Sequence, residues 1–132
     1  MTNCVFCQID LNPNQQIILE NEHCLFLQLN QSKDTEGVLE GAGVIVPRGH
    51  RETAFDLTQE EWTATYRLLQ EVKSYLDKKH NPQGYNLGWN VGEVGGQHIF
   101  HAHFHVIPRY DNESLAGKGL RYLFKSEKNR RG

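Results

Sequence analysis

Histidine alternates with apolar residues in one stretch of the sequence, His101-Ala102-His103-Phe104-His105-Val106. Successive side chains of a β-strand point to opposite faces, so this stretch predicts a strand with three imidazoles on one face. Neutral imidazole is a metal ligand and a nucleophile, and its ordinary pKa of about 6.5 also lets it carry protons near neutrality. The alternative is a half-exposed strand face that is merely rich in histidine. The stretch therefore marks both a strand of the fold and a candidate site.

A glycine-rich segment, residues 90–97, comes directly before this stretch. Glycine permits positive φ and close backbone approach, so the segment can present N–H groups to phosphate oxygens. Its end residues, Asn90 and Gln97, add amide groups at the same place. We therefore expect one site with backbone and amide donors on one side and imidazoles on the other. No acidic cluster that would hold Mg²⁺ is evident, and these groups fit phosphoryl or nucleotidyl transfer through histidine.

The remaining pattern predicts strands around one long helix. Thr58 and Glu61 form a capping box, and helical spacing continues to about residues 79–81, where Pro82 and Gly84 follow. The apolar residues at helical spacing are Trp62, Tyr66, Leu69, Val72 and Leu76. Apolar runs typical of further strands are Ile17–Glu20, Cys24–Leu29, Gly43–Pro47 and Tyr85–Val91. Together these elements indicate an α+β fold with mainly antiparallel strands.

Length and composition favour a single domain over residues 1–132. The chain has 132 residues, of which 38% are hydrophobic and 23% charged, a balance that excludes wholesale disorder. Its apolar runs are far shorter than the roughly 20 residues of a membrane helix, and its start does not resemble a signal peptide. The net charge of −2 predicts no large basic surface. We therefore expect a soluble cytoplasmic protein with no membrane or nucleic-acid partner.

The charge is nevertheless uneven along the chain. Residues 118–132 carry six Lys or Arg side chains and one Glu, within a basic C-terminal tail that begins at about residue 111. Such a tail is either solvated or helps to hold an anionic substrate or a second subunit.

Four motifs follow one another along the chain: Val44-Ile45-Val46-Pro47-Arg48-x-His50, Asn90-x-Gly92, Gly95-Gly96-Gln97 and His101-x-His103-x-His105-Val106-Ile107. In this combination the sequence resembles the histidine triad (HIT) family, over roughly residues 4–109. The resemblance implies about five antiparallel strands, one long helix and a shorter N-terminal helix. It also implies an enzyme that hydrolyses or transfers at the α-phosphate of a nucleotide through a covalent nucleotidyl-histidine.

The resemblance assigns roles to particular residues. His103 is the nucleophile, and His105 donates a hydrogen bond to a non-bridging phosphate oxygen. The residues that steady the phosphate or the leaving group are Asn90, Gly95, Gly96 and Gln97. His98 stands where small hydroxyl residues are common in the family, and it either donates a proton to the leaving group or faces solvent.

Cys4 and Cys7 form a C-x2-C pair, which alone fits a zinc half-site, a redox pair or coincidence. The resemblance supplies two partners, His50 and His101, because some family members bind zinc through such a set. Two thiolates and two imidazoles make a closed, structural type of Zn²⁺ site. The alternative is a pair of free thiols beside a hydrogen-bonded His50.

Recognition of the nucleoside is less defined. Apolar residues that either sandwich a base or belong to the core are Phe6, Ile9, Leu25 and Leu27. The family usually has an acidic residue after the second strand to bind ribose, and this sequence has none in the matching place. The remaining candidates for ribose binding are Gln28, Asn30 and Asp34.

Three functions therefore stay open at this point. Asn90 favours cleavage of a nucleoside phosphoramidate or a related AMP derivative. The alternatives are diadenosine polyphosphate hydrolysis and a non-catalytic module that binds nucleotide or zinc. Family members commonly form homodimers through the long helix and the next strand, and the aromatic residues placed to do so here are Trp62, Tyr66, Tyr85 and Trp89.

Overall fold

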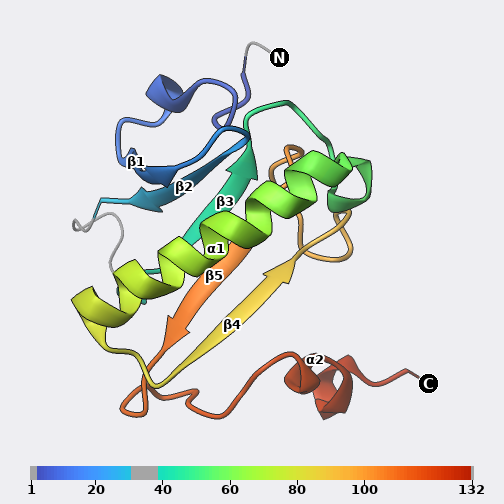
Figure 1. Cartoon of the computed structure of the whole chain (residues 1–132). Coiled ribbons are helices and arrows are strands. Elements are labelled where there is room, and N and C mark those ends of the chain that lie inside the picture. The colour runs from blue at the N-terminus through green and yellow to red at the C-terminus, as the bar shows by residue number, and fades with distance from the viewer. Residues whose placement is uncertain (1–2, 31–38, 132) are drawn as a thin grey trace.

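The computed structural model describes residues 3–30 and 39–131, which form a five-stranded sheet and one long helix (Figure 1). The strands are β1 (Gln15–Glu20), β2 (Cys24–Leu29), β3 (Gly43–Pro47), β4 (Gly84–Trp89) and β5 (Phe104–Arg109). They lie in the order β1-β2-β3-β5-β4, and every neighbouring pair is antiparallel. The shorter elements are α2 (Arg121–Lys125) and the 3-10 turns η1 (Ile9–Leu11), η3 (Ala54–Asp56) and η4 (Glu127–Asn129). This confirms the predicted α+β fold.

The long helix, α1 (Gln59–His80), begins and ends where its capping residues predict. The hydroxyl of Thr58 accepts a hydrogen bond from the N–H of Glu61 at 3.1 Å, and the Glu61 carboxylate accepts one from the N–H of Thr58 at 2.8 Å. At the other end Asn81 adopts the left-handed conformation, with φ of 49°. Asparagine tolerates this conformation better than most residues, and Pro82 after it cannot extend the helix.

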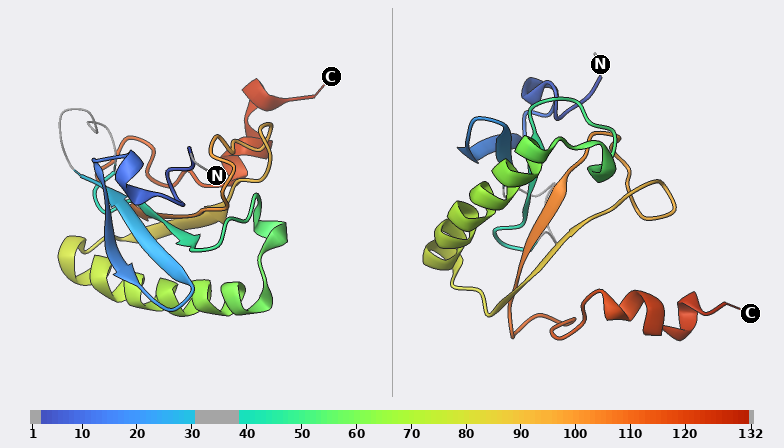
Figure 2. Two further views of the ribbon diagram at one scale, coloured as in Figure 1. Left: turned by 90° about the horizontal axis from the view of Figure 1, so that it is seen from above. Right: turned by 45° about the vertical axis from the view of Figure 1, so that its right-hand side comes forward.

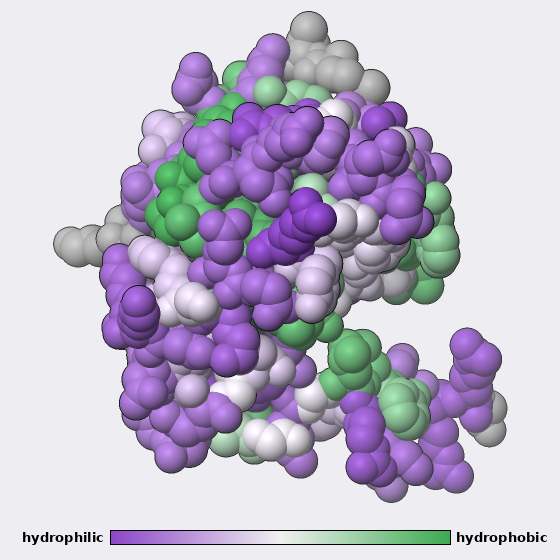
Figure 3. All heavy atoms as spheres, viewed as in Figure 1, coloured by the Kyte–Doolittle hydropathy of each residue, from purple (hydrophilic) through white to green (hydrophobic). Residues whose placement is uncertain are grey.

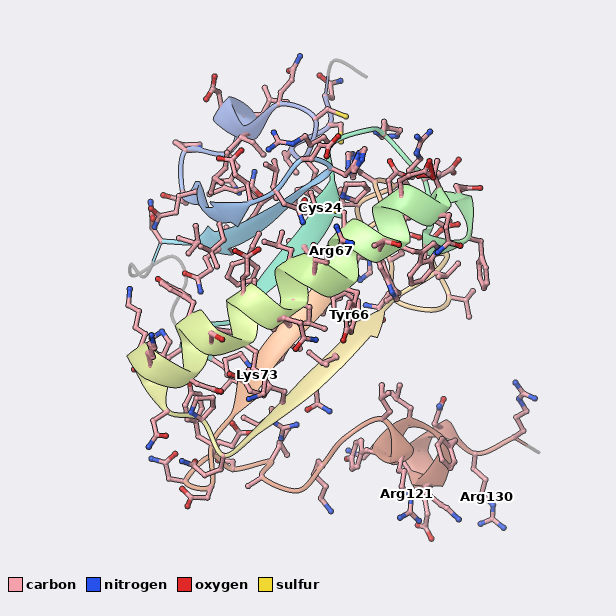
Figure 4. All side chains as sticks on the ribbon, in the orientation of Figure 1. Cys24, Tyr66, Arg67, Lys73, Arg121 and Arg130 are labelled. Carbon is pink, nitrogen blue, oxygen red and sulfur yellow. The ribbon has the colours of Figure 1, made fainter. Side chains whose placement is uncertain are left out.

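One face of the sheet packs against α1 (Figure 2). Cys24 lies between β2 and α1 (Figure 4), where its sulfur is 3.6 Å from the Thr65 hydroxyl. The buried residues of this core are Cys24, Phe26, Ile45, Val106, Ala64, Leu68, Val72 and Leu76. Val72 and Leu76 of the predicted apolar face are buried, but Trp62 and Tyr66 are 41% and 64% exposed, because the first half of the stripe that faces the sheet runs through Ala64 and Leu68.

The N-terminal segment covers part of the opposite face (Figure 2). A second buried cluster there consists of Phe6, Leu25, Leu27 and Val46. Cys4, Val5, Ile9 and Val44 pack against it. The two faces follow from strand alternation: in β2, Leu25 and Leu27 face the N-terminal segment while Cys24 and Phe26 face α1. This second face is the one that carries the catalytic candidates.

Three details differ from the sequence-based expectation. The predicted short N-terminal helix is the single 3-10 turn η1, and the strand expected over Tyr85–Val91 ends at Trp89. The histidine row only partly belongs to a strand, since β5 begins at Phe104. The N–H of Ala102 donates to the carbonyl of Arg51 at 2.6 Å, so the chain here pairs with a loop instead of a strand.

The chain after β5 forms a C-terminal segment that leads away from the sheet (Figure 1). Arg109 anchors its first part, because the guanidinium donates to Glu113, to Asn86 and to the carbonyls of Leu115 and Lys118. Exposed apolar side chains gather further along it (Figure 3), and Arg121 and Arg130 lie at a distance from the sheet (Figure 4). Among the described residues, no helix has the length and apolar character needed to cross a membrane.

Candidate functional site

His103 lies on the face opposite α1 and is only 8% exposed. Its Nδ1 is 2.9 Å from the carbonyl oxygen of His101. A carbonyl can only accept, so Nδ1 carries the proton and Nε2 keeps its lone pair. Burial lowers the pKa of His103, although the bond to the His101 carbonyl opposes this effect. The structure therefore holds His103 as a neutral imidazole with a defined nucleophilic nitrogen.

His105, in β5, lies beside it, and the two ring centroids are 5.0 Å apart. Burial lowers the pKa of His105, and the nearby charge of protonated His103 would lower it further. Its Nε2 is fully buried, and within the described part of the chain it has no hydrogen-bond partner. A buried polar atom without a partner is costly, and in a site it marks a position where a ligand atom belongs.

The glycine-rich segment folds into a tight loop next to these histidines. Gly92 and Gly96 have φ values of +78° and +97°, and a Cβ at Gly95 would lie 2.4 Å from the carbonyl oxygen of Val91. Glycine is thus required at these three places. The N–H groups of Gly95, Gly96 and Gln97 donate to carbonyls within the loop, so the expectation that they face a phosphate is wrong for these three groups.

Gln97 is fully buried and holds this loop to its surroundings. Its Nε2 donates to the carbonyls of Glu52 at 2.7 Å and Ile99 at 3.0 Å, and its Oε1 accepts from the N–H of Gly92 at 3.0 Å. The sequence gives no sign that Glu52 accepts this hydrogen bond, because the acceptor is its backbone carbonyl and lies 45 residues from Gln97. The Gln97 side chain thus holds the glycine-rich loop against the backbone at Glu52.

Two other predicted residues lie at the surface of the same loop. Asn90 is exposed, and its amide nitrogen is 3.5 Å from the carbonyl of Gly96. His98 is also exposed.

The structure brings together the four predicted metal ligands, Cys4, Cys7, His50 and His101, whose candidate ligand atoms all lie within 4.8 Å of one another. Sulfur of Cys7 is 3.2 Å from Nδ1 of His50 and 3.5 Å from Nδ1 of His101, and the two nitrogens are 3.2 Å apart. Ligand atoms bonded at about 2.0–2.3 Å around a tetrahedral ion are separated by about 3.3–3.8 Å. The group can therefore hold a metal ion.

The orientation of His101 supports this fit. Its Nε2 is 2.8 Å from the carbonyl oxygen of Pro47, at the end of β3, so Nε2 carries the proton. The lone pair of Nδ1 then faces the thiols. Such a carbonyl partner is usual for a metal-bound histidine, because it fixes both tautomer and ring orientation.

A cavity of about 480 Å³ opens beside the two catalytic candidates, and His103 and His105 are part of its lining. Phe6 and Leu27, which were predicted to contact a base, also line it. Leu25 and Ile9 belong to the adjoining cluster and are not among its lining residues.

The residues proposed for ribose binding are not gathered in one place. Gln28 lines the cavity, and its amide donates to the carbonyl of Gly41 at 3.0 Å. Asn30 bonds to the side chain of Gln16, and Asp34 lies outside the described residues.

The comparison with protein families matches residues 11–112 to the HIT domain. The chain belongs to the HIT family. Protein hit of Bacillus subtilis is 32% identical over 111 residues, which cover 82% of this chain and 72% of that protein. A HIT family protein from Bacillus anthracis has a crystal structure that matches with a TM-score of 0.74 and 30% identity, over 98% of this chain and 86% of that one.

Three other HIT relatives have names or descriptions that mention an activity or a metal. The adenylylsulfatase HINT3 of Arabidopsis thaliana is 30% identical over 90% of this chain, which spans only 59% of that protein. The adenosine 5'-monophosphoramidase hnt1 of Schizosaccharomyces pombe is 26% identical, over 89% of this chain and 82% of that protein. A Zn-bound histidine triad family protein from Mycobacterium smegmatis matches with a TM-score of 0.72 and 25% identity, over 89% and 83% of the chains.

The buried amide of Gln97 gives a first test of how this HIT site is held. Gln97→Ala removes three hydrogen bonds and leaves two carbonyls and one N–H unpaired, so we expect it to lower the free energy of unfolding by about 2–3 kcal/mol. Asn90→Ala, which changes an exposed amide of the same loop, should lower it by less than about 0.5 kcal/mol. Urea unfolding followed by circular dichroism measures both free energies. Equal effects of the two substitutions would contradict the role of Gln97 in holding the loop.

Proposed function

We propose that the protein is a nucleotide hydrolase or transferase that attacks the α-phosphate of its substrate with His103. The observation that carries this proposal is the pairing of two buried imidazoles with different tasks. Nδ1 of His103 is committed to the carbonyl of His101, which leaves Nε2 free for attack. Nε2 of His105 is buried beside it without a partner in the described chain, so it is available to a phosphate oxygen.

The proposed first step is an in-line displacement at phosphorus. Nε2 of His103 forms a bond to phosphorus while the bond to the leaving group breaks, and the leaving group departs with the electron pair and takes up a proton. The ring of His103 becomes positively charged in this step, and the carbonyl of His101 stabilises that charge through Nδ1–H. In the second step water attacks phosphorus, the electron pair returns to Nε2, and a proton is released.

His105 positions the phosphate in this proposal, and the loop lies on the side of the leaving group. His105 donates a hydrogen bond from Nε2 to a non-bridging oxygen. Asn90, Gly95, Gly96 and His98 lie on the loop side, where the leaving group would depart, and Gln97 holds that loop in place through its bonds to Glu52 and Ile99.

The relatives support an AMP derivative as substrate. One named relative is an adenylylsulfatase and another an adenosine 5'-monophosphoramidase. We therefore propose a nucleoside phosphoramidate or a related AMP derivative, ahead of a diadenosine polyphosphate.

Trapping the intermediate tests the nucleophile. We expect wild type mixed briefly with an adenosine phosphoramidate to gain the mass of one AMP unit, and His103→Ala to gain none. The quench must be denaturing and alkaline, because phosphohistidine hydrolyses in acid. Steady-state turnover should fall by on the order of 10⁴-fold in His103→Ala. His23→Ala, which removes a histidine at the β1–β2 turn, should keep both adduct and turnover.

The same assay, repeated with diadenosine polyphosphate, separates the alternatives. Faster turnover of the polyphosphate would move the substrate assignment to that class. Binding of AMP without turnover of either substrate would show a non-catalytic nucleotide-binding module and contradict the enzymatic proposal.

We further propose that the metal held by Cys4, Cys7, His50 and His101 is zinc. The donor set is closed, with two sulfur and two nitrogen atoms, which is typical of structural Zn²⁺ sites. Bound there, zinc would cross-link the N-terminal segment to the chain that carries His103. No open ligand position is proposed, so the ion takes no part in the attack on phosphorus.

Metal analysis tests this assignment. We expect protein purified without chelator to contain about one zinc per chain, and Cys7→Ser to retain much less, since three ligands hold zinc more weakly than four. Mass spectrometry of the metal gives the content, and thermal unfolding should show a lower Tm for Cys7→Ser. Cys24→Ala changes the third cysteine, which is buried against α1, and should keep its zinc. Folded wild-type protein without metal would refute the proposal.

We also propose a homodimer that pairs along β4 and α1. β4 is an edge strand, Leu87 in it is 41% exposed, and Trp62 and Tyr66 present aromatic rings on the neighbouring helix. The other two aromatic residues predicted for the interface have partners within the chain. Trp89 contacts Trp62 and Phe104, and the hydroxyl of Tyr85 donates a hydrogen bond to Asp77.

The oligomeric state checks this surface directly. We expect light scattering at micromolar concentration to give the mass of a dimer for wild type and of a monomer for Leu87→Asp, because the carboxylate would be buried in the interface. Leu11→Asp places the same charge on the exposed turn η1 and should stay dimeric. A monomeric wild type would contradict the pairing.

A further inference from the structure

The floor of the cavity beside His103 is a regular apolar surface set by the strand register. On this face His105 of β5 pairs with Val44 of β3, and Val44 pairs with Leu27 of β2. These three residues form one row across the sheet, with the imidazole at one end and two apolar side chains next to it. A phosphate held by His105 therefore has apolar neighbours along the sheet.

The next row in the same direction is apolar throughout. Gly43 pairs with Gln28 and with Val106, so the residues one step further, Leu29 and Ile107, flank Ala42. All three line the cavity. Two residues of a strand span about 7 Å, which is the reach from a phosphate to the sugar attached to it. The sugar of a nucleotide bound through His105 thus meets leucine, alanine and isoleucine side chains.

Each neutral polar side chain of the cavity has one amide atom bonded to the backbone. The amide of Gln15 donates to the carbonyl of Val5 at 2.9 Å, and Asn12 accepts from the N–H of Asn14 at 3.0 Å. Gln28 points to the carbonyl of Gly41. Of the described residues that line the cavity, none has a carboxylate or an ammonium group. Leu29 lines the cavity and is 39% exposed.

We infer that this cavity selects a neutral, largely apolar group next to the phosphorus and does not select for the sugar hydroxyls. The inference rests on the proposed function and names its substrate class: ribo- and 2'-deoxyribonucleotide derivatives are both substrates. An apolar pocket distinguishes an added or missing hydroxyl by up to about 10²-fold, whereas a site built to hydrogen-bond that hydroxyl does so by about 10⁴-fold or more. The two strand rows beside His105 form an apolar surface of the first kind.

The test compares two substrates that differ by one hydroxyl. With the zinc-loaded full chain we expect kcat/KM for adenosine 5'-phosphoramidate and its 2'-deoxy analogue to agree within about tenfold. Leu29→Asp places a carboxylate where the sugar passes and should raise the preference for ribose by about tenfold or more, because the carboxylate accepts from its hydroxyls. Leu29→Asn is the uncharged control of the same size and should raise it less.

Several outcomes would overturn the inference. A wild-type preference for ribose above about tenfold would show that hydroxyls are recognised, and loss of that preference in Asp34→Asn would assign their recognition to Asp34. An unchanged preference in folded Leu29→Asp would show that the sugar does not pass over this row.

Binding to His103→Ala separates this inference from the proposed function. Calorimetry with AMP and dAMP on this variant gives the ratio of dissociation constants without any turnover. A ratio within about tenfold supports the inference even if neither phosphoramidate is hydrolysed, an outcome that would contradict only the enzymatic proposal. A ratio above that overturns the inference whatever the enzymatic result.

Discussion

The contact between Nε2 of His101 and the carbonyl of Pro47 is the constraint on which the site depends. It fixes which nitrogen of His101 carries the proton, and so turns Nδ1 toward His50 and the thiols of the N-terminal segment. The same residue offers its own carbonyl to Nδ1 of His103. One residue thus connects the end of β3, the candidate metal ligands and the proposed nucleophile, and a shift of its ring would disturb all three.

The short segment after His50 extends this connection to the rest of the site. The carbonyl of Arg51 accepts from Ala102, between the two histidines, and the carbonyl of the next residue, Glu52, accepts from Gln97 in the glycine loop. The histidine row and the loop are therefore held by the same few residues of backbone. Backbone carbonyls are suitable anchors because their positions depend on the fold and not on a side-chain rotamer.

Sequence reasoning succeeded where the determining forces are local. Thr58, Glu61 and Asn81 act on residues within one helical turn, so the limits of α1 could be predicted. The four candidate metal ligands could also be expected to lie together once the family resemblance was recognised. It was less successful with Gln97, whose partner lies 45 residues away, and with the start of β5, which depends on the loop at Arg51. The exposed side of α1 was misjudged because Trp62 and Tyr66 continue the apolar face beyond one side of its core stripe.

The start of α1 holds the loop at Arg51 against the core. Glu61 is 5% exposed, and burial alone would raise its pKa, but hydrogen bonds from Arg51 and Thr58 lower that pKa overall. The carboxylate therefore stays ionised at the positive end of the helix dipole while it holds the Arg51 side chain at 2.9 Å. Because the Arg51 carbonyl accepts from Ala102, a charge that first serves to cap a helix also fixes the backbone between His101 and His103. Helix capping and the placement of the proposed nucleophile, His103, are thus parts of one hydrogen-bonded network.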